Sequence, residues 1–312
     1  MARTHILPKL LQILVVLVGV SFLSFLLIYL APGDPVRSMF TVSGHIPPEE
    51  TLSEIRAELG LDRPFLVHYF SWLKNCLRGD FGRSYTRGQP VAKLLAARVL
   101  PTVELALLSL AMMLVMAVPL GFAAALNQNK PLDYLIRGLT FFGVSMPNFW
   151  VGLILLYVVA LKLGWLPVVA TGMGFKKMIL PAFTLAWAMS GKYARQVRAA
   201  ALEELSGDYV SGARARGIPE SVILWRHVVP NASLPLLTLL GLSLGSLLGG
   251  TAVVEVIFSY PALGSLALSA ITSADYPLIQ GFVRWIALIY MLVNLAVDFS
   301  YGRLDPRLRK GR

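Results

Sequence analysis

Long apolar runs separated by polar segments dominate the chain, and most of these runs approach the length that crosses a lipid bilayer. A helix needs about 20 apolar residues to cross a hydrocarbon core of ~30 Å. The pattern predicts five clear spans and one shorter span, and therefore an all-α polytopic membrane protein with six transmembrane helices. The predicted spans are residues 10–30, 103–126, 139–161, 178–191, 234–258 and 282–299.

The fourth run, 178–191, is the short one, because Lys192 follows it directly. Long Lys and Arg side chains can extend to the membrane interface from inside a span. A helix that continues through Lys192 and Arg195 would therefore still cross the bilayer. A re-entrant segment is the alternative.

The distribution of basic residues predicts the orientation of the spans. Six spans put both chain ends on one side, and loops rich in Lys and Arg stay in the cytoplasm. Both tails, 1–9 and 302–312, and the segment 192–230 are rich in basic residues, whereas 259–281 contains none. Three lysines in the short loop 162–177 are the exception. We therefore expect cytoplasmic N- and C-termini.

The segment 31–100 between the first two spans carries its own helical pattern. Apolar side chains recur at helical spacing after Pro64, and the pattern repeats more weakly at 50–59 and at 91–99. We expect an external helical cap, which either packs over the bundle or receives a partner. The residues of the main stripe are Leu66, Tyr69, Phe70, Leu73 and Leu77.

Composition supports a membrane protein and argues against several chemistries. Of 312 residues, 56% are apolar and 14% are charged, against roughly 25% charged in an ordinary soluble domain. The net charge of +11 reflects the basic tails and loops, and we expect no nucleic-acid partner. One cysteine and four scattered histidines show no metal-ligand spacing, so we predict no metal, no cofactor and no catalytic site. The phosphate-loop pattern of ATPases is absent, so any ATPase must be a separate chain.

The cytoplasmic segment from residue 205 to 217 predicts a short, bounded helix. Asp208 is a suitable N-cap, Gly217 a suitable C-terminal cap, and Pro219 suits the first turn of the next helix. Small residues in this helix would let another backbone approach closely. A solvated connector is the alternative from spacing alone. The small residues are Ser211, Gly212, Ala213 and Ala215.

The same segment, together with other short motifs, resembles the permease subunits of binding-protein-dependent ABC importers in the peptide/nickel family. The family's loop has Glu-Ala-Ala, then a Gly and a Pro at fixed spacing. Ser211-Gly212-Ala213, Gly217 and Pro230 occupy those positions, with Ser in place of Glu and Gly in place of the first Ala. Further matches in order along the chain are 32–35, 59–64, 79–82, 100–105, 208–210, 254–258, 275–280 and 304–307.

The resemblance implies the type I ABC importer permease fold in a bacterial inner membrane, with a permease core at 101–301. It implies four partners besides the lipid bilayer: a homologous second permease, two ATPases that use ATP, and an external substrate-binding protein. The short helix would be the coupling helix. The resemblance implies ATPase contacts for Asp208, Tyr209, Ser211, Gly212, Ala213 and Gly217. Relatives import nickel, metal chelates, dipeptides or oligopeptides, so the substrate stays open.

Several residues in or beside the spans are candidates for the pathway. Gly241, Gly245 and Gly249 share one face of the fifth span, either for packing within the bundle or for the seam with the second permease. Pro147 predicts a kink in the third span, which is either a hinge or a simple bend. Glu255 either pairs structurally or faces the outer mouth of the pathway.

Other charged residues suggest structural roles at span ends. We expect Glu104 to favour a helix N-terminus, and Arg284 and Asp298 to act as interfacial anchors. An ion-coupled secondary transporter is the rival function. It would need mid-membrane carboxylates or broken helices in two repeats, and the sequence shows no clear inverted repeat. An intramembrane enzyme would need a nucleophile and a base in the bilayer, which the sequence does not offer.

Overall fold

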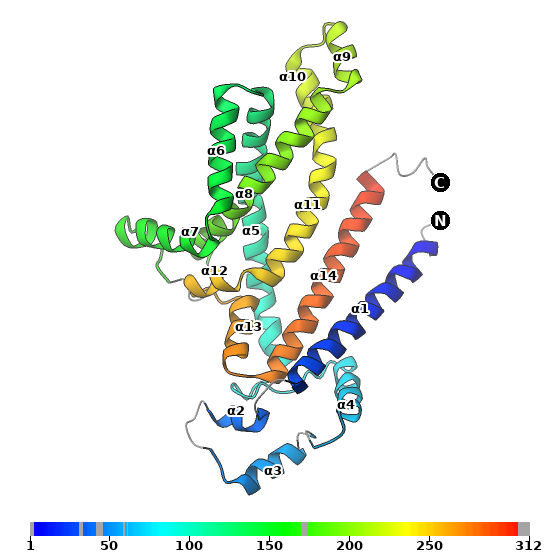
Figure 1. Cartoon of the computed structure of the whole chain (residues 1–312), viewed down its shortest axis with the longest axis vertical. Helices are drawn as coiled ribbons and strands as arrows, with labels where there is room; N and C mark the ends of the chain where they lie inside the picture. The colour runs from blue at the N-terminus through cyan, green and yellow to red at the C-terminus, as the bar shows by residue number, and fades with distance from the viewer. Residues whose placement is uncertain are drawn as a thin grey trace. The chain divides into compact units, whose positions relative to one another are not determined.

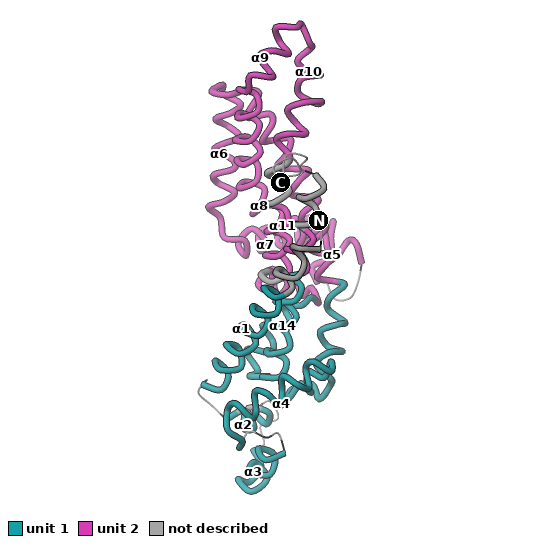
Figure 2. The backbone as a smooth tube through the Cα atoms, turned by 90° about the vertical axis from the view of Figure 1, so that its right-hand side faces the viewer, with its two compact units in different colours: residues 1–100, 262–291 teal, residues 101–261, 292–312 magenta. Residues whose placement is uncertain are grey.

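The computed structural model of the chain describes residues 3–30, 34–41, 46–58, 60, 62–169 and 174–304, and these residues are almost entirely helical (Figure 1). An isolated bridge between Arg83 and Pro90 is their one β-type pairing. The chain divides into two compact units (Figure 2). Unit 1 comprises Met1–Leu100 and Ala262–Met291, and unit 2 comprises Pro101–Pro261 and Leu292–Arg312.

Unit 1 contains the first helix, the segment 31–100 that is predicted to be external, and the helices near residue 270. Its elements are α1 (Arg3–Leu30), α2 (Pro35–Thr41), α3 (Glu49–Glu58), α4 (Phe65–Leu77), the start of α5 (Val91–Leu126), α13 (Leu263–Thr272) and the start of α14 (Tyr276–Leu304). The helices predicted at 50–59 and after Pro64 are confirmed as α3 and α4. Of the predicted stripe on α4, only Tyr69 is buried, because that helix packs on α1 through one residue per turn and leaves Leu66 and Phe70 exposed.

An aromatic cluster joins α1 to α4. Phe25 packs against Phe65, Tyr69 and Trp72 with ring centroids 4.9–5.6 Å apart. The hydroxyl groups of Ser21 and Tyr69 share a buried hydrogen bond of 2.8 Å. Offset and edge-on ring pairs of this kind add to the energy of burial. The first helix and the cap helix are therefore held together by specific contacts.

We expected a separate cap helix at 91–99. The structure instead has this segment as the first part of α5. The helix runs through Pro101, which removes only one backbone hydrogen bond, so one proline does not end it. Val91 and Leu95 pack with Leu263, Leu266, Ala270 and Leu278 in the core of unit 1. Gly281 permits this contact, because a Cβ atom there would lie 2.5 Å from Val91 Cγ1. α13 occupies a segment that the sequence analysis treated as a loop.

Unit 2 contains most of the residues predicted to form the core, 101–301, and the segment 192–230 that is predicted to be cytoplasmic. Its further elements are α6 (Pro131–Ser145), α7 (Asn148–Leu155), the π-helix η1 (Leu156–Lys162), α8 (Phe175–Leu205), α9 (Asp208–Ala215), α10 (Glu220–Ile223), the π-helix η2 (Leu224–Val228), α11 (Val229–Gly250) and α12 (Ala252–Ile257). Figure 1 shows α9 and α10 together at one end of this unit.

The third predicted span, 139–161, is not one continuous helix. It breaks at Met146 and Pro147, and α6 and the α7–η1 stretch meet at 98°. A residue before proline avoids the α conformation, and Met146 is accordingly extended. The proline therefore breaks the helix, where the sequence analysis expected a kink.

The fourth predicted span continues as expected, and the fifth does not. α8 is a 31-residue helix that runs through Lys192 and Arg195, so the re-entrant alternative is not found. The fifth predicted span, 234–258, is interrupted at Thr251, where α11 ends before α12 begins. Thr251 has a ψ angle of 5°, which leaves the helical region and redirects the chain.

By length and composition, three helices of the described chain suffice to cross a membrane: Leu11–Leu30, Val91–Leu126 and Tyr276–Ala296. The bent pair α6 and α7–η1 would add a fourth. The remaining two predicted spans lie on α8 and α11. α8 packs closely on its neighbours, since a Cβ atom on Gly191 would lie 2.5 Å from the Thr140 carbonyl oxygen and one on Gly121 would lie 2.5 Å from Val197 Cβ.

Candidate functional site

The short helix predicted in the segment 205–217 is present as α9. Gly207, rather than Asp208, holds the N-cap position, and no side chain caps the helix. Asp208 is instead the first residue of the helix, where a carboxylate favours the positive end of the helix dipole. The cap position therefore differs by one residue from the prediction.

Gly217 ends α9 in the manner predicted. Its φ angle is +70°, a left-handed conformation that glycine adopts without strain. The N–H of Gly217 donates to the Arg214 carbonyl at 2.9 Å, and the N–H of Ile218 donates to the Ala213 carbonyl at 3.2 Å. This pair of bonds is the Schellman motif, which satisfies carbonyl groups at a helix end. α9 therefore has a firm C-terminal boundary.

One face of α9 is buried and fixes the helix to unit 2. Val210 and Ala213 pack with Ile223 and Val228 in a small hydrophobic cluster, and Phe122 of α5 packs against it. Its small size led us to expect Ala213 at a partner contact. Ala213 is instead 3% exposed and faces inward. The helix repeat places one residue in three or four on the inner face, and Ala213 belongs to that face with Val210.

The opposite face of α9 is open to solvent. Its exposed residues include Asp208, Tyr209, Ser211 and Gly212. The Tyr209 hydroxyl donates to Glu204 Oε2 at 2.6 Å, and burial followed by that carboxylate raises the pKa of Tyr209. A Cβ atom on Gly212 would meet no atom within 4 Å. The structure thus separates the predicted contact residues into an exposed set and the buried Ala213.

A buried ion pair that sequence reasoning missed joins α6 to α8. Asp133 is fully buried and accepts hydrogen bonds from Arg198 Nε at 2.8 Å and Nη2 at 2.7 Å. It also accepts one from the Asn129 N–H at 3.0 Å. The hydrogen-bonded Arg198 guanidinium is the main reason why the pKa of Asp133 lies below its usual range. The only sequence signal was an acidic residue in the first turn of a helix.

The pathway candidates lie on different elements of unit 2. Gly241 and Gly245 are buried on α11, as packing within the bundle requires, and Gly249 is near its end. Pro147 lies between α6 and α7. The hydroxyl of Tyr193 on α8 contacts the Leu239 carbonyl and Ser243, which ties α8 to α11. The seam with a second permease stays a prediction.

Glu255 is fully buried in α12, and the Thr251 hydroxyl donates to its carboxylate. This geometry favours the structural pairing over an open position at the mouth of the pathway. Nearby, the Tyr260 hydroxyl donates to the Pro101 carbonyl at 3.2 Å. Burial, then the charges of Glu104 and Glu255, raise the pKa of Tyr260 to about 12. Two carboxylates therefore lie close to one buried tyrosine.

One of the structural expectations for charged residues is wrong. Glu104 lies in the interior of α5 and not at a helix N-terminus, because the helix already begins at Val91. Arg284 stacks on Trp72, 3.1 Å from the ring centroid, and donates to Cys76 Sγ at 2.6 Å, and its role as an interfacial anchor stays a prediction. The side chain of Asp298 lies outside the described residues. The described side chains include no group of three His, Cys, Asp or Glu residues placed to hold a metal.

Comparison with known proteins decides the family. Residues 117–310 match the profile of the binding-protein-dependent transport system inner membrane component, and residues 1–106 match the profile of its N-terminal part. The chain belongs to this family. The permease is therefore a multi-pass inner-membrane subunit of an ABC importer and not an enzyme.

Two relatives of similar length are named as glutathione transport permeases. The permease is 36% identical over 305 residues, 98% of both chains, to the glutathione transport system permease protein GsiC of Salmonella typhimurium strain LT2. It is 35% identical to the GsiC protein of Escherichia coli strain K12, again over 305 residues and 98% of both chains. These are proteins that the permease resembles.

Solved structures confirm the fold class. The permease is similar to a chain of the inward-facing MetNI methionine ABC transporter, with a TM-score of 0.58 at 18% identity, over 68% of this chain and 96% of that one. It is also similar to an amino acid ABC transporter crystallised with histidines, with a TM-score of 0.51 at 20% identity, over 69% and 94%. The permease has the type I ABC importer fold.

Proposed function

We propose that this permease forms half of the translocation pathway of an ATP-driven importer and that α9 couples it to a cytoplasmic ATPase. Its partners are a homologous second permease, two ATPases that bind and hydrolyse ATP, and an external substrate-binding protein. Both termini lie in the cytoplasm. The observation that carries the proposal is the short, exposed helix α9, bounded by Gly207 and Gly217 and packed by its inner face onto unit 2.

The geometry of α9 suits a mechanical connection. Because Val210 and Ala213 pack against Phe122 of α5 and against Ile223 and Val228, a push on α9 reaches α5 and the helical stretch that leads into α11. The exposed residues Ser211 and Gly212 present little side-chain bulk, so an ATPase groove can approach the backbone. Closure of the ATPases would then move these helices together.

The substrate that we propose is a short peptide of the glutathione type. The similarity to GsiC proteins over nearly the whole chain supports this choice over nickel. The described residues offer no metal-ligand cluster, so a metal would have to pass as a chelate. Nickel chelates and longer peptides are the alternatives that the uptake assay separates.

The test is uptake of radiolabelled glutathione into liposomes that contain the permease, its second permease and both ATPases, with the binding protein outside. Gly212→Trp fills the exposed face of α9 without a clash inside the fold. We expect at least a tenfold loss of uptake while the complex still assembles. Ser221→Trp, an exposed position on α10, is the matched control and should retain uptake.

Two results would overturn the proposal. Normal uptake by the Gly212→Trp permease would show that α9 does not contact the ATPase. Uptake without ATP, driven by an ion gradient, would establish the secondary transporter instead. Transport of a nickel chelate in place of glutathione would leave the importer intact and correct only the substrate.

A further inference from the structure

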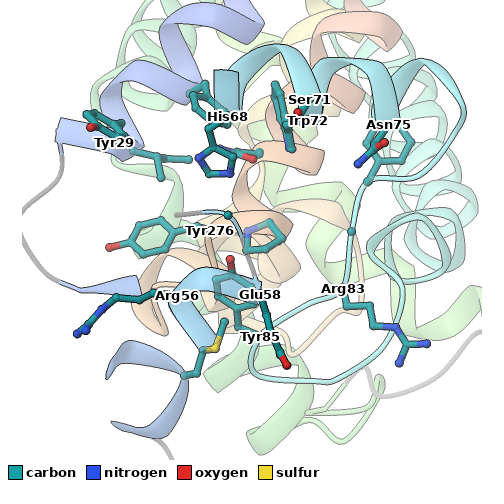
Figure 3. Close-up of a pocket in the computed structure, with 18 of the residues that line it drawn as sticks. Tyr29, Arg56, Glu58, His68, Ser71, Trp72, Asn75, Arg83, Tyr85 and Tyr276 are labelled. Atoms are coloured by element: carbon teal, nitrogen blue, oxygen red, sulfur yellow. The ribbon is translucent and has the colours of Figure 1, made fainter. Parts of the chain in front are cut away.

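Unit 1 contains a cavity of about 910 Å³ in the segment predicted to be external (Figure 3). Its walls come from the end of α1, from α3 and α4, from the loop 81–85 and from the start of α14. Figure 3 shows His68, Trp72 and Tyr276 around its centre, whereas the side chains of Arg56 and Arg83 point away at opposite sides of the view. The periodicity of the sequence gave no sign of it.

Each wall of this cavity is held by its own contacts. Arg56 bonds to Asp34 and to Glu49, which ties α3 to the start of α2. The aromatic cluster described above holds α1 and α4 together. Phe25, Trp72, Asp34 and Arg56, which make these contacts, also line the cavity.

The loop wall is the most firmly held. Asp275 is fully buried and accepts hydrogen bonds from the Thr86 hydroxyl at 2.8 Å, from the Tyr85 N–H at 3.1 Å and from the Thr86 N–H at 3.2 Å. The Ser84 hydroxyl also donates to it. One carboxylate therefore fixes three consecutive residues of the loop to the turn before α14.

The cavity is partly open to the surface, since Glu58, Arg63 and Arg83 in its lining are exposed. Ligand pockets have volumes of about 300–1,000 Å³ and combine apolar walls with a few polar groups. The volume and the mixed lining of this cavity agree with that description, and walls that are already held in place lower the cost of binding.

The charges of the lining narrow the choice of ligand. Asp34 and Arg56 neutralise each other. Glu58, at the end of α3, and Arg63, just before α4, also line the cavity, and the described residues provide neither with an ion-pair partner. Arg83 lines the cavity as well, but its side chain points away from the centre in Figure 3. Apart from Arg83, the cavity thus offers one negative and one positive group from neighbouring positions. A simple anion would meet the Glu58 carboxylate, and a simple cation would meet Arg63.

The rest of the lining is aromatic and neutral. Tyr29, Trp72, Tyr85 and Tyr276 supply ring surface, and Asn75 supplies an amide. Burial, then the nearby charge of Arg63, lower the pKa of His68, so its imidazole is neutral near pH 7 and can exchange hydrogen bonds. Rings and uncharged polar groups beside two opposite charges suit a small molecule with charged ends and a variable middle.

We infer that this cavity binds a short zwitterionic peptide, with Glu58 toward the ammonium group, Arg63 toward the carboxylate and the aromatic rings along the side chains. The inference rests on the proposed function, since it gives an importer of short peptides a receiving site on its own external segment. The peptide would meet this site when the binding protein releases it.

The test measures peptide binding by the complete transporter in lipid nanodiscs without the binding protein. The probes are reduced glutathione and trialanine, in equilibrium dialysis. We expect saturable binding that falls at least tenfold in Glu58→Gln and in Arg63→Gln. Glu54→Gln on α3 and Arg78→Gln after α4, which are exposed and do not line the cavity, are the matched controls and should bind normally. Trialanine with an acetylated N-terminus and an amidated C-terminus should bind at least tenfold more weakly.

Several outcomes would refute the site. Equal binding of free and blocked trialanine would show that the charged ends are not recognised. An equal loss in the control variants would show that no specific position matters. Displacement of glutathione by inorganic phosphate alone, or by phosphatidylglycerol in the nanodisc, would identify an anion or lipid headgroup site instead.

Failure of this inference and failure of the proposed function give different results. If the assembled transporter imports glutathione with ATP while Glu58→Gln and Arg63→Gln bind and transport normally, the cavity inference fails and the function stands. If ATPases do not co-purify and uptake does not need ATP, the function fails, whether or not glutathione binding depends on Glu58 and Arg63.

Discussion

Removal of the Asp133 carboxylate tests the buried ion pair between α6 and α8. In Asp133→Ala, the Arg198 guanidinium loses both carboxylate oxygens that accept its hydrogen bonds, at 2.7 and 2.8 Å. The Asn129 N–H also loses its bond to Asp133. Asp133 has no exposed surface, whereas the Arg198 side chain is 20% exposed. The variant therefore leaves one partly buried charge on α8 without its counter-ion.

The expected loss follows from this geometry. Breaking a buried pair by removal of one partner costs about 3–5 kcal/mol. Because water reaches part of Arg198, we expect a value near the lower limit, about 3 kcal/mol. For a domain of 150–250 residues, each kcal/mol shifts the Tm by roughly 2–4 °C, so the Tm should fall by roughly 6–12 °C.

The assay is thermal unfolding of the detergent-solubilised permease, followed by tryptophan fluorescence and by size-exclusion chromatography. Asp133→Ala combined with Arg198→Met removes both charges and should recover most of the loss. Glu203→Ala, an exposed position on the same helix α8, is the control and should change the Tm little. A Tm for Asp133→Ala within about 1 °C of the parent protein would refute the reasoning.

The same pair predicts a pH dependence with a definite sign. Arg198 lowers the pKa of Asp133 in the folded protein, so the ionised pair stabilises the fold at every pH above the unfolded carboxylate pKa of about 3.9. This stabilisation is lost as the pH falls through the lowered pKa of the folded state. The Tm difference between the parent protein and Asp133→Ala should therefore be constant between about pH 5 and 8. It should shrink at lower pH.

Three further changes test other contacts. Gly191→Ala forces a Cβ atom to 2.5 Å from the Thr140 carbonyl oxygen and should cost roughly 1–3 kcal/mol in thermal unfolding, whereas Gly138→Ala, with no atom within 4 Å, should not. Asp275→Asn weakens the bonds that hold residues 84–86, so trypsin should cleave after Arg83 or Arg87 several times faster than in the parent protein; unchanged cleavage would contradict the role of Asp275. Gly217→Ala places a Cβ atom on a residue with a φ of +70°, which should cost about 1–2 kcal/mol and loosen the end of α9. The binding protein should then stimulate ATP hydrolysis less than in the parent transporter. Full stimulation would argue against a rigid α9.

The elements that could be predicted are those that local patterns determine. The apolar runs gave the positions of α1, α8 and α14, and Pro64 marked the start of α4. Gly217 marked the end of α9, because a left-handed residue is needed there whatever surrounds the helix. Each of these signals depends only on residues within a few turns.

The breaks inside the predicted spans were harder to predict from the sequence, because an apolar run does not show where the chain turns. The run at 234–258 contains no polar break of more than one residue, yet α11 ends at Gly250. The run at 139–161 did contain Pro147, but a proline in a span can bend a helix or end it. Which outcome occurs depends on the neighbours that accept the freed backbone groups.

Contacts between distant parts of the sequence could not be predicted at all. Ser84 and Asp275 are 191 positions apart, and Cys76 and Arg284 are 208 apart. Neither member of these pairs carries a local sign of its partner. The cavity in unit 1 depends on the first of these contacts, so it was equally hidden from the sequence.

Arg284 shows why the type of a charged residue is a poor guide to its role near a membrane. By position it should extend to the interface, as arginines at span ends commonly do. It also lies on the face of Trp72, whose ring attracts a cation, and donates to Cys76 Sγ, so it connects α14 to the cap helix α4. The ion pair of Asp133 and Arg198 likewise connects two helices, α6 and α8. In both places a charge next to a span connects two helices, and this agrees with a transporter that takes its energy from ATPase subunits and not from an ion moving between side chains.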